Sequence, residues 1–553
     1  MTLFQVTRKQ FIYFALCIAI ILCSEATDNS NPIFKCGKDN FTPIPLTLNN
    51  LLPLDQKNTK YRRALDSDGF KDFNIFLDLN NFDDEIQKYN LQNKRDLFVK
   101  GMQKAIKTLQ SLLRVKAPRN FIFNDEQIRN ILINKWDKTK IGTEISNQNK
   151  GMANLGIDLY IFVRFGDNSE LGNHTLASAG ARYVDPLTGQ PLVGVVNINR
   201  EADYTRKNSL EYFEGVIVHE FTHILGFLNY FFIHYFHNYY TKIDKFGIQR
   251  GYINSTKVIQ VAKKYFNCNS IEGVELENIG GEGTVGSHWE ARILLGEYMN
   301  GIIYTPEQVI SEFTLALLED TGIYKANYYT GGLMQFGKNK GCEFLYSKCI
   351  NNGNINQKFS NEFFDKIKNQ FNNVGIDTSC SSGRQSRTYH FLYHYNNGIP
   401  QDYQYFSNPN IGGFSSVDYC PVSLSFDSEE KNIYYVGHCS EKGGKNYGSY
   451  IPYKDLQNNI ITYNSGDLSP ITGETQSSNS FCALSTLISK SVNNYQIYSN
   501  TLRAVCYKMY CSDKSLTLQI NNNFIVCPRG GGKITSLNFD GYLLCPDYNL
   551  ICS

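Results

Sequence analysis

The sequence predicts an α+β protein whose first and second halves are organised differently. Up to about residue 228, strand-like apolar segments are interspersed with amphipathic helices, which indicates a mixed sheet covered by helices. Residues 229–345 combine short helical patterns with glycine-rich loops. From residue 346 the chain is rich in Cys, Asn and Tyr, which favours a disulfide-rich domain that leans toward β structure. We therefore expect subdomains at 64–228 and 229–345 and a cysteine-rich domain at 346–553.

The composition is that of a folded protein without a strong charge bias. Among the 553 residues, 42% are hydrophobic, 54 are Lys or Arg and 52 are Asp or Glu, which leaves a formal net charge of +2. The apolar share is sufficient for ordinary cores. The near balance of charge argues against nucleic acid as a partner, because nucleic-acid-binding surfaces are basic.

The first 26 residues are expected to be a signal peptide. Arg8 and Lys9 precede an apolar run of 13 residues that ends at Cys23, and small residues follow. That run is too short to span a bilayer comfortably, and no later apolar stretch reaches 18 residues. We expect a mature chain without a transmembrane helix that is secreted or lumenal in the secretory pathway. Peripheral association with the cell surface is left open.

Cysteine usage agrees with an oxidising compartment. Two of the 15 cysteines lie in the signal peptide, Cys36 stands alone, and the remaining twelve run from Cys268 onward. Twelve cysteines can make six disulfides. Asn-x-Ser/Thr triplets at Asn40, Asn173 and Asn254 weakly indicate a glycoprotein.

Residues 27–63 are interpreted as a pro-segment. They are polar, lack clear periodicity and end in the basic stretch Lys60-Tyr61-Arg62-Arg63, which resembles a processing site. A solvated linker is the alternative. Beyond this segment, residues 73–79, 159–165 and 193–198 have strand patterns. An amphipathic helix is predicted from apolar residues at helical spacing, namely Phe98, Met102, Ala105, Leu109 and Leu112.

The segment 211–227 is the most informative about function. His219 and His223 are four positions apart, which places them one turn apart on the same face of a helix. Two imidazoles in this arrangement can bind one Zn²⁺. Glu220, next to the first of them, is then placed to act as a general base on zinc-activated water. A pair of ordinary buried or surface histidines is the alternative.

A catalytic zinc site needs a third protein ligand. Gly226 would let the chain turn at the end of the helix, but Asn229 stands where a histidine would complete the pattern H-x-x-G-x-x-H. His288, which follows a glycine-rich loop, is the best candidate by its local context. A carboxylate from Glu272, Glu277 or Glu290 is the alternative, and the remaining histidines are His174, His234, His237, His390, His394 and His438.

These residues resemble leishmanolysin, a surface metzincin family. The resemblance rests on His-Glu-Phe-Thr-His-Ile-Leu-Gly-Phe at 219–227, a long insertion, and Gly-Ser-His-Trp-Glu at 286–290, with Met299 eleven positions after His288. It implies a metzincin-type catalytic domain with a mixed sheet and an active-site helix. It also implies that His219, His223 and His288 bind one Zn²⁺ per chain, with Met299 as the Met-turn methionine beneath the metal.

The resemblance further implies a disulfide between Cys268 and Cys342 and a pro-segment thiol, for which Cys36 is the only candidate, that caps the zinc before activation. The implied function is that of a secreted zinc metalloendopeptidase acting on protein or peptide substrates, and we expect a monomer. A catalytically silent adhesion or binding protein on the same fold is the alternative. The chain departs from the family pattern because it has no cysteine between Cys36 and Cys268. We also expect no lipid-anchor tail.

Overall fold

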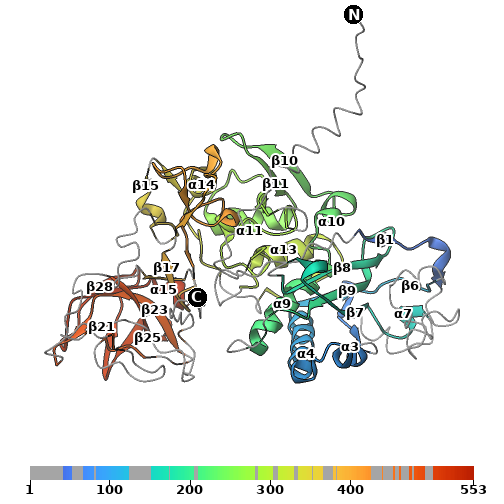
Figure 1. The fold of residues 1–553 in the computed structure, drawn as a ribbon, viewed down its shortest axis with the longest axis horizontal. Coiled ribbons are helices and arrows are strands. Elements are labelled where there is room, and N and C mark those ends of the chain that lie inside the picture. The colour runs from blue at the N-terminus through green and yellow to red at the C-terminus, as the bar shows by residue number, and fades with distance from the viewer. Residues whose placement is uncertain are drawn as a thin grey trace, which may run out of the picture.

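The computed structural model describes residues 42–552 with gaps, of which the longest are 53–66, 124–150, 365–377, 425–438, 440–452, 462–471 and 492–501. Its mixture of helices and strands, its several sheets and its six disulfides confirm the predicted α+β class (Figure 1). The expected signal peptide at 1–26, Cys36 and the basic stretch at 60–63 lie outside the described residues.

A five-stranded mixed sheet forms the centre of the first half. In spatial order its strands are β1 (Ile44–Pro45), β8 (Ala177–Val184), β9 (Pro191–Asn199), β7 (Leu159–Gly166) and β4 (Ile75–Asp78). β4, β7 and β9 are parallel, β8 is antiparallel to β9, and β1 is parallel to β8. The three strands predicted from the sequence are confirmed as β4, β7 and β9.

Both faces of this sheet are covered, because its central strands are buried along nearly their whole length. Side chains on β7 alternate between two cores, as the period of a strand requires. Ile161 and Val163 belong to the core beneath the helices. Tyr160 and Phe162 belong to the core on the opposite face, which also contains Phe121.

The edge strand β1 belongs to the expected pro-segment and continues the sheet beyond β8. Ile44 pairs with Tyr183, and the backbone N–H of Leu46 donates to the carbonyl of Val184 at 3.0 Å. Leu46 is only 1% exposed. Leu46 thus anchors this edge strand in the fold, although Pro45 is exposed.

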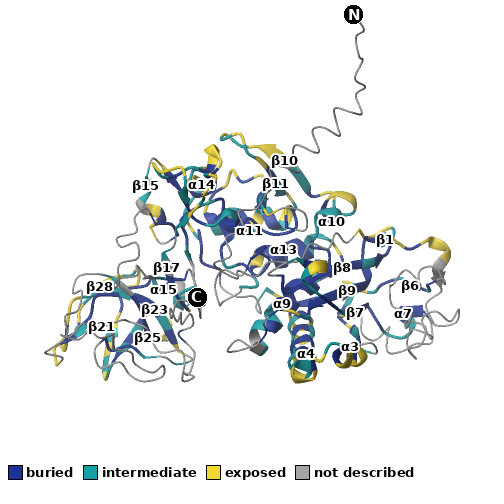
Figure 2. Cartoon of the chain, in the orientation of Figure 1, coloured by how far each residue is buried: buried dark blue, intermediate teal, exposed yellow. Residues whose placement is uncertain are grey.

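Two long helices, α4 (Arg95–Leu112) and α9 (Ser209–Ile224), pack against each other and cover one face of the sheet (Figure 2). α4 buries the whole predicted apolar stripe, so that prediction is confirmed. Gly101 permits the close approach of the two helices, because a Cβ at this position would lie 2.4 Å from the ring of Phe213.

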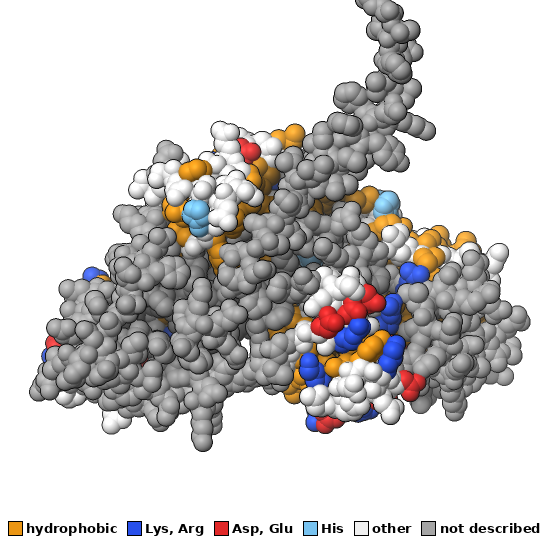
Figure 3. Space-filling model, viewed as in Figure 1, with side chains coloured by type: hydrophobic (Ala, Val, Ile, Leu, Met, Phe, Trp, Pro, Cys, Tyr) orange, Lys and Arg blue, Asp and Glu red, His pale blue; other side chains and the backbone are white. Residues whose placement is uncertain are grey.

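Shorter elements complete this half of the chain. They are α3 (Phe82–Lys88), α7 (Gly151–Asn154), α8 (Asn168–Leu171), the pair β2 (Leu51–Leu52) with β6 (Asn120–Phe121), and the sheet of β13 (Tyr324–Ala326), β5 (Leu113–Lys116) and β3 (Phe70–Asp72). Side chains of both signs mingle around α3 and α4 (Figure 3), where exposed pairs join Arg95 to Asp83 and Lys100 to Asp96. This surface is a mixed, solvated one rather than a basic patch.

The central region combines helices with a small sheet. Its elements are α10 (Asn229–His234), β10 (Tyr239–Ile243), β11 (Gln249–Ile253), α11 (Thr256–Phe266), β12 (Val274–Leu276), α12 (Ala291–Leu294), α13 (Glu312–Asp320) and α14 (Cys342–Tyr346). β10, β11 and β12 form an antiparallel sheet. A disulfide between Cys268 and Cys342 joins the end of α11 to the start of α14.

The rest of the chain is mostly short strands. Those before residue 470 are β14 (Ile350–Asn351), β15 (Asn354–Ile355), β16 (Thr378–Cys380), β17 (Arg387–His390), β18 (Tyr393–His394), β19 (Ile411–Gly412), β20 (Ser423–Leu424), β21 (Tyr453–Lys454) and β22 (Ile460–Ile461). A six-stranded sheet follows, in the order β27 (Asn523–Val526), β26 (Leu516–Ile520), β25 (Arg503–Cys511), β23 (Ser480–Ser485), β30 (Leu543–Cys545) and β28 (Gly532–Ile534). The pair β24 (Ile488–Ser489) with β29 (Phe539–Asp540) and helix α15 (Tyr548–Ile551) complete it.

Five further disulfides hold this second half: Cys349–Cys420, Cys380–Cys482, Cys439–Cys506, Cys511–Cys552 and Cys527–Cys545. The six-stranded sheet has a hydrophobic core of its own. The main core, in contrast, continues past residue 346, because Phe359, Tyr405 and Val417 pack in the same cluster as α9. The division of the chain into domains stays a prediction.

Among the described residues, one segment, Tyr212–His234, is long and apolar enough by composition to cross a membrane, and it comprises most of α9 and all of α10. However, 78% of its apolar window is buried inside the protein. Packing against the sheet therefore accounts for its apolar character.

Candidate metal centre

The two histidines of α9 face each other near the end of the helix. The Nε2 atoms of His219 and His223 lie 3.1 Å apart, as the spacing of four residues on one helical face requires. Both side chains are buried. Apolar residues on the same helix, among them Val218, Phe221 and Ile224, fill the main core and so anchor the helix that carries the pair.

The chain turns sharply after this pair. Gly226 has a φ of +116°, a conformation that L residues with a Cβ rarely adopt, and its N–H donates to the carbonyl of His223. This turn brings the carbonyl of Phe227 back onto the ring of His223. Asn229, at the position of a classical third histidine, begins α10, and its backbone N–H contacts the Ser287 hydroxyl at 3.4 Å.

His288 completes the group from a distant part of the sequence. The segment 284–290 lies beside β12, where the N–H of Glu277 donates to the carbonyl of His288 at 2.9 Å. The His288 ring is fully buried, and its centroid lies 5.2 Å from that of His219 and 4.9 Å from that of His223. We call these three residues the histidine cluster.

Backbone carbonyls fix the tautomer of every imidazole in the histidine cluster. A carbonyl oxygen can only accept, so each Nδ1 must carry the proton and each Nε2 must present a lone pair. The Nδ1 atoms of His219, His223 and His288 donate to the carbonyls of Tyr298, Phe227 and Thr284 at 2.6, 2.7 and 2.9 Å. The Nε2 of His288 is buried and has no hydrogen-bond partner among the described residues.

This donor set fits a divalent cation. The ligand nitrogens all lie within 4.8 Å of one another, and neighbouring nitrogens of a tetrahedral zinc site are roughly 3.3 Å apart. Burial lowers the pKa of His219 to about 4 and that of His288 to about 3. Burial and the neighbouring rings also hold the pKa of His223 well below its ordinary value. The imidazoles are therefore neutral near pH 7, which is the form that binds a metal.

The other residues expected at the site surround the histidine cluster. Glu220 is buried on α9 next to His219. Met299 is fully buried, and its carbonyl accepts from the N–H of Trp289, which follows His288. The turn after Met299 passes close to the His288 ring, because a Cβ on Gly301 would lie 3.4 Å from His288 Nδ1.

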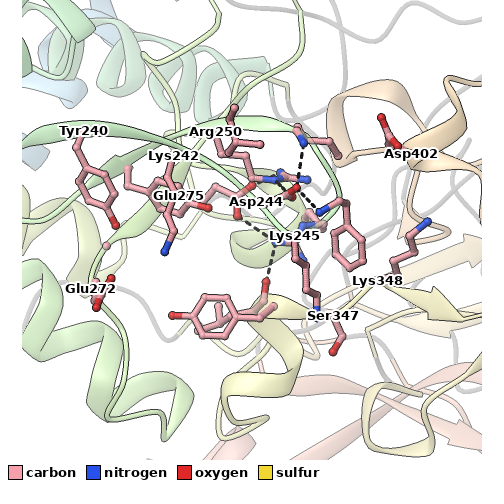
Figure 4. Close-up of a pocket in the computed structure, with 18 of the residues that line it drawn as sticks. Tyr240, Lys242, Asp244, Lys245, Arg250, Glu272, Glu275, Ser347, Lys348 and Asp402 are labelled. Carbon is pink, nitrogen blue, oxygen red and sulfur yellow. Dashed lines mark hydrogen bonds and ion pairs between the residues drawn. The ribbon is translucent and has the colours of Figure 1, made fainter.

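A second buried polar group includes Glu275 of β12. The carboxylates of Glu275, Glu290 and Asp418 come within 4.8 Å of one another, and the guanidinium groups of Arg250 and Arg292 lie between them. We call these five residues the carboxylate–arginine cluster. Three of its members, Arg250, Glu275 and Arg292, line a cavity of about 440 Å³, in which Arg250 and Glu275 meet Asp244 (Figure 4).

Ion pairs neutralise much of this second group. Arg250 binds Glu275, Asp418 at 2.7 Å and Asp244 at 2.8 Å, and Arg292 binds Glu275 at 3.1 Å. Burial, followed by the charge of Asp418, raises the pKa of Glu290 well above its ordinary value. A cation would have to compete here with two guanidinium groups, so this group is less suited to a metal than the histidine cluster.

The structure therefore brings His219, His223 and His288 together and places Glu290 in the other cluster. Cys268 and Cys342 form a disulfide, and Cys36 lies outside the described residues. Sequence reasoning missed the Tyr298 carbonyl and the Glu297 carboxylate that precede Met299. Their closeness to Met299 in the sequence was the only signal that pointed to them.

Comparison with known proteins identifies the family. The family model described as leishmanolysin matches residues 91–553. A leishmanolysin homolog of Crithidia fasciculata is 30% identical over 380 residues, covering 66% of this chain and 51% of the relative. A leishmanolysin-like peptidase of Drosophila melanogaster is 26% identical over 461 residues, covering 73% of this chain and 64% of the relative. A leishmanolysin of Leishmania major is 28% identical over 271 residues, covering 48% of this chain and 41% of the relative.

The match to these three relatives spans less than two thirds of the length of each. The family model, in contrast, extends over most of this chain and includes α9, the segment 284–302 and the cysteine-rich region. The chain belongs to the leishmanolysin family.

Proposed function

We propose that this chain is a zinc-dependent metalloendopeptidase of the secretory pathway, with one Zn²⁺ per chain bound by His219, His223 and His288. The observation that carries the proposal is the convergence of three neutral imidazoles whose Nδ1 atoms are already bonded and whose Nε2 atoms face one another. The name of a relative, leishmanolysin-like peptidase, supports the same reaction class.

Zinc, when bound, supplies Lewis-acid chemistry that polarises a peptide carbonyl and makes water a nucleophile near neutral pH. Glu220 is proposed as the general base, which takes the proton of the attacking water and passes it to the leaving amine. Its place beside His219 on a rigid helix keeps the carboxylate close to the reacting atoms. Met299 contributes an apolar floor that excludes water from beneath the histidine cluster.

The setting of the site suits proteolysis outside the cytosol. Six disulfides form and persist in oxidising compartments, which supports a secreted or lumenal protein. We propose protein or peptide substrates and a latent precursor in which the thiol of Cys36 occupies the position of the nucleophile. A catalytically silent binding protein remains the second candidate, but it would have no use for a carboxylate at position 220.

The test compares Glu220→Gln with Glu214→Gln in the protein after removal of the proposed pro-segment. Glu214 lies on the same helix, but its carboxylate accepts from Thr108 and pairs with Lys104, away from the histidine cluster. We expect Glu220→Gln to lose about 10²- to 10⁴-fold in casein hydrolysis while zinc content, measured by elemental analysis, stays at one per chain. The Glu214→Gln control should retain both casein hydrolysis and one zinc per chain.

Two outcomes would contradict parts of the proposal. Full hydrolysis by Glu220→Gln would refute the general base. Absence of chelator-sensitive hydrolysis in the unmodified protein, despite bound zinc, would favour the silent alternative.

A further inference from the structure

The carboxylate of Glu297 lies at the centre of the turn that contains Met299. It is only 2% exposed. One of its oxygens accepts from the backbone N–H of Met299. The other accepts from the hydroxyls of Ser311 and Thr314 at 2.8 and 2.6 Å, so the turn is tied to the first turn of α13.

These bonds lead to two of the three imidazoles. Tyr298, the residue between Glu297 and Met299, offers the carbonyl that accepts from His219 Nδ1 at 2.6 Å. The residues on either side of Tyr298 are thus both held in place. Glu297 is held through its side-chain carboxylate, and Met299 is held through its backbone N–H. The orientation of the His219 ring therefore depends on the position of this turn.

The second route leads to His288. The hydroxyl of Thr314 donates to Glu297 and accepts from the indole N–H of Trp289 at 2.8 Å. Trp289 directly follows His288, and its backbone N–H donates to the Met299 carbonyl at 3.0 Å. A chain of hydrogen bonds thus runs from Glu297 to the residue beside the third imidazole, and such chains strengthen each member.

A carboxylate is a costly group for an ordinary turn. No ion pair with Glu297 is found among the described residues, and its hydrogen bonds come from neutral donors. Burial raises its pKa to about 7, against the bonds from Thr314, Met299 and Ser311. An amide of the same shape could fill the space without the cost of burying a charge. The arrangement is explained if the turn must be held by several strong bonds at once.

We propose that Glu297 is a positioning residue for the metal centre, which holds the Tyr298 carbonyl and the His288–Trp289 segment so that His219 and His288 direct Nε2 to one ion. The proposal rests on the proposed zinc function and deepens it. Glu297 does not touch the reacting atoms, because its partners are the backbone and hydroxyl donors named above. Groups of this kind orient metal-binding histidines, and their loss typically weakens metal binding about 10- to 100-fold.

The experiment measures zinc affinity by competition with a chelator in full-length protein carrying Glu220→Gln, so that no catalysis is needed. Glu297→Gln is compared with Glu312→Gln, which alters an exposed carboxylate one residue after Ser311. We expect about 10- to 100-fold weaker zinc binding by Glu297→Gln and no change in the control. The absorption spectrum of the cobalt(II)-loaded protein should also shift, because it reports ligand geometry, which a merely structural role would leave unchanged.

A second variant decides the case if Glu297→Gln does not fold. Thr314→Val keeps the shape of the side chain but breaks the link between Trp289 and Glu297, and we expect weaker zinc binding and a shifted cobalt(II) spectrum. Unchanged affinity and spectrum in a folded Glu297→Gln, or in Thr314→Val when only that variant folds, would overturn the proposal. If the Glu220→Gln parent itself binds no zinc, the proposed function fails, and that result is distinct from equal binding by parent and variant.

Discussion

The histidine cluster and the carboxylate–arginine cluster share one short segment, yet their polar groups are satisfied in opposite ways. His288 belongs to the first and Glu290, two residues later, to the second. In the histidine cluster the Nδ1 atoms are bonded and the Nε2 lone pairs face one another. In the carboxylate–arginine cluster, guanidinium groups already lie between the carboxylates.

This contrast shows that a group of potential ligands is not by itself a metal site. Both clusters bring metal-binding side chains within bonding reach of one point and both are buried. What differs is the counter-charge. Guanidinium groups pair with carboxylates in one cluster. The other presents neutral lone pairs, which suit an added cation, and the predictions below test that difference.

The largest expected effect is on metal binding. His288→Ala removes one of the three proposed ligands and should abolish stoichiometric zinc binding and all chelator-sensitive hydrolysis, as scored by elemental analysis and a casein assay. His234→Ala, which alters an exposed histidine on α10, is the matched control and should leave both intact. Zinc retained at one per chain by His288→Ala would move the third ligand elsewhere.

The second effect is on stability. Asp418→Asn removes a charge that binds Arg250 and approaches Arg292, so it leaves buried guanidinium groups underpaired. We expect a loss of about 3–5 kcal/mol in the free energy of unfolding, measured with denaturant, while zinc content of the folded protein is unchanged. Asp402→Asn alters an exposed carboxylate at the rim of the same cavity and should change stability by less than about 0.5 kcal/mol.

A loss below about 1 kcal/mol in Asp418→Asn would show that these ion pairs are not structural. Loss of zinc from folded Asp418→Asn would show that the two clusters are coupled. Either result would contradict the contrast between the histidine cluster and the carboxylate–arginine cluster.

The smallest effect is a pH dependence confined to the metal-free protein. In the folded protein the pKa of His219 is about 4 and that of His288 about 3, both below the ordinary value of 6.5. Between these values the unfolded chain binds more protons than the folded one, so stability falls as the pH drops below about 6.5. At pH 5.5 we expect a loss of about 1 kcal/mol for each of these two imidazoles relative to neutral pH.

Thermal unfolding with and without chelator measures this loss. Zinc occupies the lone pairs and should flatten the profile over the same range, because the bound imidazoles cannot take up protons. The metal-free His288→Ala protein should show a shallower slope than the metal-free parent. Parallel profiles for the zinc-bound and metal-free protein would contradict the assignment of neutral imidazoles.

Local patterns predicted the parts of this structure that depend on neighbouring residues. The apolar stripe of α4 and the pairing of His219 with His223 follow from helical geometry alone. His288 comes from a distant segment, and only its context and the family resemblance pointed to it. Arg250 and Asp418 pair although they are 168 positions apart in the sequence, and no local sequence pattern predicts such a contact.

The same limit applies to the carbonyls that orient the imidazoles. Tyr298 and Thr284 orient the imidazoles through their backbone carbonyls, which every residue type has. The residue types at those positions therefore do not indicate this role. Only the folded path of the chain creates it. The sequence therefore predicts the side chains suited to bind the metal better than it predicts the backbone carbonyls that orient them.

The strand β1 has a consequence for the proposed activation by cleavage of the pro-segment. Residues 44–46 lie along β8, and a cut at the basic stretch 60–63 would leave them attached by hydrogen bonds and by the buried Leu46. Before the cut the segment is tethered, so its effective concentration at β8 is high. Afterwards it becomes a separate peptide in a dissociation equilibrium. Cleavage and release are then two events, and dilution as well as proteolysis would determine how quickly the edge of β8 becomes free.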